Sequence, residues 1–367
     1  MIDSNSYDVV ILGAGIAGLS ATDEFLNRGL SCLVIDSNLF GQGATSAPML
    51  LANPATGRRA KKTWQAEASL NLVTDFLERV QTGSKVPFFE NNGVLRPALT
   101  EDISKDFERS PKKYDWPDHW ITWLSKSEFS KEYPFFGDHY GGLIVENSLS
   151  INGPEFIKAA LEYLSAKGAD FFECSNYSYS QKSNQWVFEL NHQKTVSSKM
   201  VVDATGFGQT QSERWNFLPL HAVKGQTATF QFEDALPLNH SVSSLGYMAF
   251  MSHCPTQLTV GSTYEHSFDH LEPTEDGLNR LKGKLRQTFP DFVEKIVDTE
   301  QWANVRVTVP DKLPIMGDHP EYANLYLIGA LGSKGMMMGR YAAYCLAESI
   351  INQKKIDPTI SVERYLT

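Results

Sequence analysis

The stretch YDVVILGAGIAGLSATDEFLNRGLSCLVID, residues 7–36, decides the fold of this chain. It begins with Tyr7–Leu12, an apolar and β-branched run that is typical of a buried parallel strand. A glycine-rich turn and an apolar helix follow, and Ser31–Ile35 predicts a second strand. The order of strand, turn, helix and strand indicates the β-α-β unit that binds dinucleotides.

Three glycines and one acid give this unit its expected function. In the G-x-G-x-x-G pattern, Gly13 permits the tight turn, Gly15 lets a pyrophosphate approach the backbone, and Gly18 lets the helix pack against the strand. Asp36 ends the second strand, where a carboxylate can accept hydrogen bonds from a ribose diol. The motif predicts a dinucleotide site without distinguishing NAD from FAD.

Length and composition limit the function classes. A chain of 367 residues is long for one core and favours two domains. The net charge of −10 argues against broad affinity for nucleic acid, which needs a basic surface. The four cysteines have no metal-ligand spacing, so we expect no metal site and a reduced compartment. Without a signal peptide or a membrane-length apolar run, we expect a cytoplasmic protein with no membrane contact.

The order of the expected elements indicates that one domain is inserted into another. Lys62–Gln81 predicts an amphipathic helix, and residues 213–310 alternate as a mainly antiparallel sheet with one long helix. The chain then returns to strand, turn and helix from Leu325 onwards. We predict an α/β fold in which residues 1–85, 141–212 and 311–367 form a discontinuous cofactor domain, and residues 86–140 and 213–310 form a substrate domain.

Further segments distinguish FAD from NAD. Gly43–Leu50 (GATSAPML) offers small residues and hydroxyls to a pyrophosphate and ribityl chain, and Val201–Gly206 (VVDATG) ends a strand in small residues. Gly246–Met251 (GYMAFM), Val305–Gly317 (VRVTVPDKLPIMG) and the later run LIGALGSKGMMMG follow in order. Together they resemble the D-amino acid oxidase and glycine oxidase superfamily of FAD enzymes. Within it, the chain is most similar to the FAD-dependent domain of the bifunctional enzyme that builds 5-methylaminomethyl-2-thiouridine in tRNA.

The resemblance implies a FAD-binding Rossmann-like domain with an inserted, mainly antiparallel α+β substrate domain. It also implies non-covalent FAD and oxidation of a C–N bond in a small amine or amino acid. Hydride would pass to the flavin, and the resulting imine would hydrolyse. The implied cofactor-binding residues are Gly13, Ala14, Gly15, Ile16, Ala17, Gly18, Asp36, Ser37, Ala44, Thr45, Ser46, Met49, Ala204, Thr205, Gly206, Gly329, Gly332, Ser333, Lys334, Gly335 and Met336.

Three side chains are the expected catalytic residues under this resemblance. Arg306 matches the arginine that binds the substrate carboxylate, although a structural salt bridge is the alternative. Tyr247 matches a tyrosine that helps to hold that carboxylate, and packing in the core is the alternative role. The family usually has a proline soon after this tyrosine, whereas Met248-Ala249-Phe250 follows it here. Lys334 would add a cation beside the flavin, or is an exposed loop lysine.

One basic run has more than one interpretation. The segment Gly57–Lys62 (GRRAKK) could dock tRNA phosphate, clamp a pyrophosphate or an anionic substrate, or be a solvated loop, and the acidic total charge favours the last. The alternative function is therefore oxidative cleavage of carboxymethylaminomethyl-uridine in tRNA. A non-catalytic flavin-binding protein and an NAD-dependent dehydrogenase are further alternatives.

Overall fold

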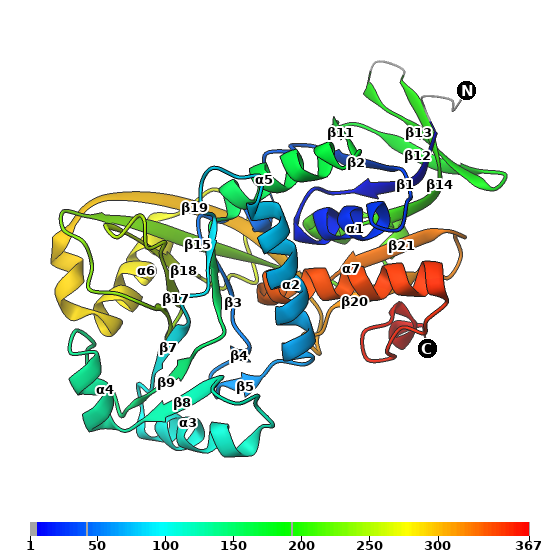
Figure 1. Ribbon diagram of the computed structural model, residues 1–367. Helices are drawn as coiled ribbons and strands as arrows, with labels where there is room; N and C mark the ends of the chain where they lie inside the picture. Colours follow the sequence, from blue (N-terminus) through cyan, green and yellow to red (C-terminus); the bar gives the residue numbers. More distant parts are fainter. Residues whose placement is uncertain (1–5, 42, 192–193, 367) are drawn as a thin grey trace.

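The computed structural model describes residues 6–41, 43–191 and 194–366. The fold is built on two large sheets (Figure 1). The first sheet has the order β11-β2-β1-β14-β13-β12, and β21 pairs with both β14 and β20. Its central pairs β11·β2, β2·β1, β1·β14 and β14·β21 are parallel, as the apolar run Tyr7–Leu12 predicts for β1. The strands are β1 Ser6–Leu12, β2 Cys32–Asp36, β11 Asp170–Glu173, β12 Ser178–Lys182, β13 Gln185–Glu189, β14 Thr195–Asp203, β20 Ile315–Asp318 and β21 Leu325–Gly329.

Helices cover this sheet and share one apolar core with it. They are α1 Ile16–Leu26, α2 Ala66–Gln81, α5 Gly153–Ala166 and α7 Gly335–Asn352. The start expected for the second of these helices, at Lys62, is wrong. Lys61–Lys62 form strand β5, which pairs with β4, Ala55–Thr56, and the helix begins only at Ala66.

The second sheet has the order β19-β15-β18-β17-β16-β7-β9-β8, and all its neighbours are antiparallel except β16 and β7. Helices α3 Glu101–Lys113, α4 Lys126–Glu132 and α6 Glu275–Thr288 belong to this half. The strands are β7 Val94–Pro97, β8 Ile121–Leu124, β9 Gly142–Val145, β15 His221–Phe232, β16 Ser241–Ser243, β17 Tyr247–Ala249, β18 Gln257–Gly261 and β19 Ile296–Thr308. A mixed α/β fold with a mainly antiparallel second sheet is thereby confirmed.

The strand pairing can be compared with the predicted boundary between the substrate domain and the cofactor domain near residue 140. Strand β9 pairs with β7 and β8, so Gly142–Val145 lies in the second sheet, just beyond the boundary predicted at residue 140. Strand β10, Leu149–Ile151, follows β9 in the sequence and belongs to a separate small sheet with β3, Leu50–Ala52, and β6, Phe89–Glu90. The other predicted boundaries stay predictions. Among the described residues, no helix has the length and apolarity needed to cross a membrane.

A buried ion network ties α1 to the helices around it. The fully buried Asp23 carboxylate on α1 lies 2.9 Å from Arg79, 2.7 Å from Lys167 and 2.9 Å from Arg340. Burial alone would raise the pKa of Asp23, but the charges of Arg340, Lys167 and Arg79 outweigh it and lower that pKa. The Asp23 carboxylate therefore compensates cations from α2, α7 and the end of α5.

We expect Asp23→Asn to reduce the free energy of unfolding by about 3–5 kcal/mol, because the substitution removes a fully buried carboxylate that three cations share, and the buried Arg340 then keeps Glu24 as its one carboxylate partner among the described residues. Urea unfolding measures the change. As a control, Asp75→Asn removes the other, exposed partner of Arg79 and should cost less than about 1 kcal/mol. In the native sequence, the contribution of Asp23 should be present above the pKa of an unfolded aspartate and be lost as pH falls through its lowered folded pKa. Equal effects of the two variants would contradict this role of Asp23.

Candidate functional site

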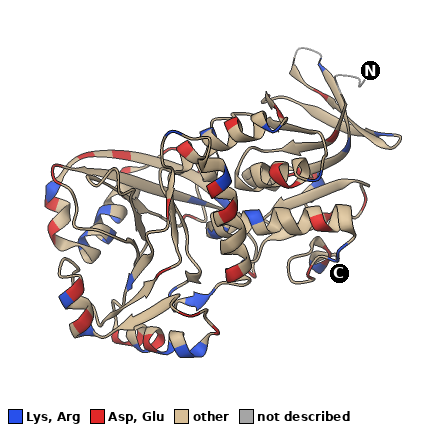
Figure 2. Cartoon of the chain, viewed as in Figure 1, with Lys and Arg blue, Asp and Glu red and all other residues tan. Residues whose placement is uncertain are grey.

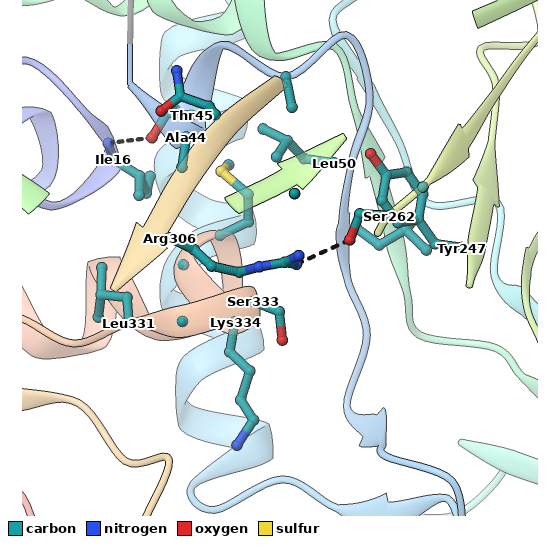
Figure 3. Close-up of a pocket in the computed structure, with 18 of the residues that line it drawn as sticks. Ile16, Ala44, Thr45, Leu50, Tyr247, Ser262, Arg306, Leu331, Ser333 and Lys334 are labelled. Atoms are coloured by element: carbon teal, nitrogen blue, oxygen red, sulfur yellow. Dashed lines mark hydrogen bonds between the residues drawn. The ribbon is translucent and has the colours of Figure 1, made fainter. Parts of the chain in front are cut away.

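One cavity of about 1010 Å³ runs from the first sheet to the second. Gly13 and Asp36, from the carboxyl ends of β1 and β2, line one end. Tyr247 and Arg306, from β17 and β19, line another part (Figure 3). The cavity therefore joins the expected cofactor residues to the expected catalytic residues.

The glycine turn has the geometry that the motif predicts. Gly13 adopts φ +102°, and a Cβ there would lie 2.6 Å from the Ala204 carbonyl oxygen. A Cβ on Gly18 would lie only 1.8 Å from the Gly13 carbonyl oxygen, so helix α1 can approach β1 only without a side chain. A Cβ on Gly15 would meet only Thr45 Oγ1, at 3.3 Å, so the space before this peptide is open. The open peptide at the N-terminus of α1 fits an anionic pyrophosphate.

Hydrogen bonds hold the polar groups around this turn. The Ala14 amide donates to Asp36 Oδ2 at 2.6 Å, and the Asn38 amide donates to Asp36 Oδ1 at 2.9 Å. The Ile16 amide donates to Thr45 Oγ1 at 3.0 Å. These bonds fix the Asp36 carboxylate at the cavity wall while leaving each oxygen able to accept a further donor.

Arg306 is a cation without a carboxylate partner among the described residues. Its Nη1 donates to Ser262 Oγ at 3.0 Å, and its Nη2 donates to the Thr263 carbonyl oxygen at 2.6 Å (Figure 3). The Tyr264 ring lies 4.2 Å from the guanidinium, and the buried Nε has no hydrogen-bond partner. Burial lowers the pKa of Arg306, against the opposing effects of Tyr264, Tyr247 and Glu265. A fixed, desolvated guanidinium with free donors is suited to an anionic ligand.

Tyr247 differs from the expected arrangement in one respect. Its hydroxyl donates a hydrogen bond to the Met49 carbonyl oxygen at 2.8 Å, and burial raises its pKa. The only hydroxyl proton is thus used by the backbone, although the ring still lines the cavity. The hydroxyl can accept a hydrogen bond from a ligand, but it does not have a free donor.

Lys334 lies in the turn before α7, and its side chain extends away from Arg306 (Figure 3). Its Nζ donates to the Lys312 carbonyl oxygen at 3.3 Å, and burial lowers its pKa. The turn itself, Gly332–Lys334, lines the cavity together with Gly335. The backbone at the positive end of α7 therefore faces the cavity.

Of the expected cofactor-binding residues, all but two line the cavity. Gly18 packs against the Gly13 carbonyl, and the Ser46 hydroxyl donates to the Gly43 carbonyl oxygen at 2.8 Å. These two residues lie behind the cavity wall and do not line the cavity, and their contact with the cofactor stays a prediction.

Sequence reasoning missed several residues that line the same cavity. Trp302 and Asn304 share one face of β19 with Arg306, because side chains alternate along a strand, and this period could have identified them. No comparable signal pointed to Tyr264, which follows β18, or to Arg96 on β7. Strand pairing over long sequence separations brings these two side chains to the cavity.

Known proteins share this architecture. The family model described as "FAD dependent oxidoreductase" (DAO) matches residues 8–349. The glycine oxidase of Geobacillus kaustophilus is 22% identical, over 95% of this chain and 93% of that protein. The tRNA 5-methylaminomethyl-2-thiouridine biosynthesis bifunctional protein MnmC of Legionella pneumophila is also 22% identical, over 100% of this chain but 58% of its own length. The crystal structure of the Geobacillus glycine oxidase superimposes with a TM-score of 0.84 at 21% identity, covering 97% of both chains, and this likeness shows the shared fold.

We expect Gly15→Val to yield folded protein that lacks FAD. The new side chain meets only Thr45 Oγ1 in the protein but occupies the open space before the Gly15 peptide. Visible flavin absorbance per protein measures cofactor content, and circular dichroism checks the fold. Gly283→Val on α6 is the matched control, because a Cβ at Gly283 meets nothing within 4 Å and the residue does not line the cavity. Full flavin content in Gly15→Val would show that the pyrophosphate does not bind here.

Proposed function

The chain belongs to the DAO family of FAD dependent oxidoreductases, and we propose that it oxidises a C–N bond of a small amine or amino acid that carries a carboxylate. The observation that carries this proposal is Arg306, a guanidinium with a buried, unpartnered Nε in the wall of the cavity. Removing such a charge from water without a counter-ion is costly, and an anionic substrate would repay that cost.

The residues around the glycine turn fit FAD. The open peptide at Gly15 and the α1 N-terminus would receive the pyrophosphate, and Asp36 would accept hydrogen bonds from the ribose. The backbone of Gly332–Gly335, at the start of α7, would stabilise negative charge on the flavin ring, at the other end of FAD. When bound, FAD supplies an acceptor for the hydride that leaves the carbon next to the amine. We propose non-covalent binding.

Arg306 would orient the substrate through its carboxylate. Its bonds to Ser262 and Thr263 and the stacked Tyr264 ring hold the guanidinium in one direction, so little side-chain entropy remains to be lost on binding. The Tyr247 ring, held by Met49, would form the adjacent wall. Tyr247 is therefore a positioning residue in this proposal, and Arg306 provides the charge.

The charges of the cavity also favour the neutral form of the substrate amine. Among the described residues that line it, the charged ones are the cations Arg58, Arg96, Arg306 and Lys334 and a single acid, Asp36. A positive surrounding lowers the pKa of a bound ammonium group. The amine would lose its proton to solvent more easily, and its lone pair would then be available to assist the departure of hydride.

The basic run Gly57–Lys62 offers less to tRNA than its sequence indicates. Arg59 pairs with Asp106 at 3.2 Å, and Lys62 pairs with Glu67 at 2.5 Å. The neighbouring helix α3 carries acids in its first turn and lysines in its last turn, so charges of both signs lie beside the run (Figure 2). Partly neutralised cations make a weak phosphate-binding surface, so we propose the small substrate ahead of modified tRNA.

Anaerobic flavin bleaching tests the proposal. Glycine, N-methylglycine and D-amino acids are each mixed with the holoenzyme, in parallel with tRNA that carries carboxymethylaminomethyl-uridine. Bleaching by a small carboxylated amine supports the proposed function. Bleaching by tRNA alone supports the tRNA alternative, and a flavin that stays oxidised with every compound supports a non-catalytic flavin-binding protein.

We expect Arg306→Gln to raise KM for a carboxylated amine about 30- to 1,000-fold, because the loss of one partner from a buried charged pair costs about 2–4 kcal/mol. Steady-state kinetics measure the change, and FAD content should be unaltered. The corresponding amide, which lacks the carboxylate charge, should show a much smaller difference between the two enzymes. Arg280→Gln, which removes only an exposed pair with Asp276 on α6, is the control and should leave KM unchanged. An unchanged KM in Arg306→Gln would remove Arg306 from the substrate site.

A further inference from the structure

We propose that the cavity contains a second anion-binding subsite at Arg58 and Arg96, and that the substrate carries a second carboxylate that binds there. This inference rests on the proposed function and names the substrate class more closely. The chain is acidic overall, with a net charge of −10, yet these two arginines line the same cavity as Arg306. Cations gathered in one cavity of an acidic protein indicate an anionic ligand.

The strand register places Arg96 on the cavity face of the second sheet. Gly261 on β18 pairs with Tyr247 on β17, and Tyr247 pairs with Ser243 on β16. Strands β16 and β7 are parallel, and Val242 pairs with Leu95. One residue further along both strands, Ser243 therefore lies beside Arg96. Paired residues point to the same side of a sheet. Arg96 therefore shares with Tyr247 the face that lines the cavity.

Arg96 has hydrogen bonds but no compensating charge. It is 4% exposed, its Nη2 donates to the Gly57 carbonyl oxygen at 2.6 Å, and its Nη1 donates to the Ala55 carbonyl oxygen. The Phe107 ring lies 5.1 Å from the guanidinium, and the buried Nε has no partner. No carboxylate in the described part of the chain pairs with Arg96. Burial lowers the pKa of Arg96 to about 10, so the side chain remains charged at neutral pH.

Arg58 adds a second cation from the segment that Arg96 holds. The carbonyls of Ala55 and Gly57 accept the Arg96 bonds, and Arg58 follows directly. Arg58 is exposed, lines the cavity, and forms no ion pair with a described carboxylate. Its neighbour Arg59 instead pairs with Asp106 and does not line the cavity.

Arg306 and Arg96 stand on widely separated strands of the second sheet, so they offer two anion-binding points. Arg306 reaches the end of β18 through its bonds to Ser262 and Thr263, and Arg96 lies on β7, three strands away. Strands are spaced about 4.8 Å apart, so the separation is roughly 14 Å between backbones. Strand β7 and the β4–β5 hairpin lie far from α1, where the pyrophosphate is expected (Figure 1). A cofactor clamp therefore does not explain Arg96, whereas an extended amine with a carboxylate at each end does.

Binding of unreactive acids to the FAD-loaded protein tests the subsite without turnover. Straight-chain dicarboxylates of increasing length are titrated against monocarboxylates of equal length, with perturbation of the flavin spectrum and thermal shift as readouts. We expect one dicarboxylate length to bind at least about tenfold more tightly than its monocarboxylate, an advantage that falls with added salt.

The variants separate the subsite from general surface charge. Arg58→Gln should remove most of the dicarboxylate advantage and leave monocarboxylate affinity unchanged, and folded Arg96→Gln should do the same. Arg59→Gln is the matched control, because it removes a neighbouring arginine that pairs with Asp106 outside the cavity. Should Arg96→Gln fail to fold, the comparison of Arg58→Gln with Arg59→Gln decides.

Several outcomes would overturn the subsite. These are equal affinity for dicarboxylates and monocarboxylates at every length, an equal effect of the Arg58 and Arg59 substitutions, and displacement of the dicarboxylate by an oligoribonucleotide at equal concentration. The proposed function fails differently, when no amine bleaches the flavin. Oxidation of small amines without any dicarboxylate advantage would leave the proposed function standing and defeat only this inference.

Discussion

The close approach of α1 to β1 is the constraint on which the rest of the structure depends. A Cβ at Gly18 would lie 1.8 Å from the Gly13 carbonyl oxygen, so the helix can rest against the strand only where a glycine stands. This contact directs the N-terminus of α1, with the open peptide at Gly15, into the cavity. On the far side of the helix, Asp23 pairs with cations of α2, α7 and the residue that follows α5, and these ion pairs hold the helix in place. A backbone contact on one side and a buried ion network on the other therefore hold the same short helix in place.

The charged residues that line the cavity are mostly cations, whereas the protein as a whole is acidic. The chain carries a net charge of −10, but within the described part of the chain the residues that line the cavity include four arginines and lysines and a single acid. Hydrogen bonds to neutral groups fix the two buried guanidiniums: Arg306 binds Ser262 and Thr263, and Arg96 binds the carbonyls of Ala55 and Gly57. Neutral partners orient a guanidinium without cancelling its charge. In the proposed function, the same cations that would attract a carboxylate would also favour a neutral amine, so one electrostatic arrangement would serve both binding and reaction.

Some helices, strands and site residues could be predicted from local sequence patterns, and others depend on tertiary contacts. The β-α-β unit and the long strand His221–Phe232 could be predicted, because apolar periodicity and glycine turns are local properties. The helix α2 was predicted to begin too early, because the lysines before it enter a hairpin with Ala55–Thr56. The hydroxyl of Tyr247 could not be assigned from sequence, since its acceptor, the Met49 carbonyl, lies far away along the chain.

The sequence by itself determined the family and the cofactor and pointed to Arg306 as a candidate, because a glycine turn and each short motif depend on neighbouring residues alone. Only the tertiary structure decided which groups surround that arginine, and that Arg96 reaches the same cavity. The pairing of β7, β16, β17 and β18 brings Arg96 and Tyr247 to one face, although the chain separates them widely. Such pairing follows from the closure of the whole sheet over its core, and no local pattern encodes it.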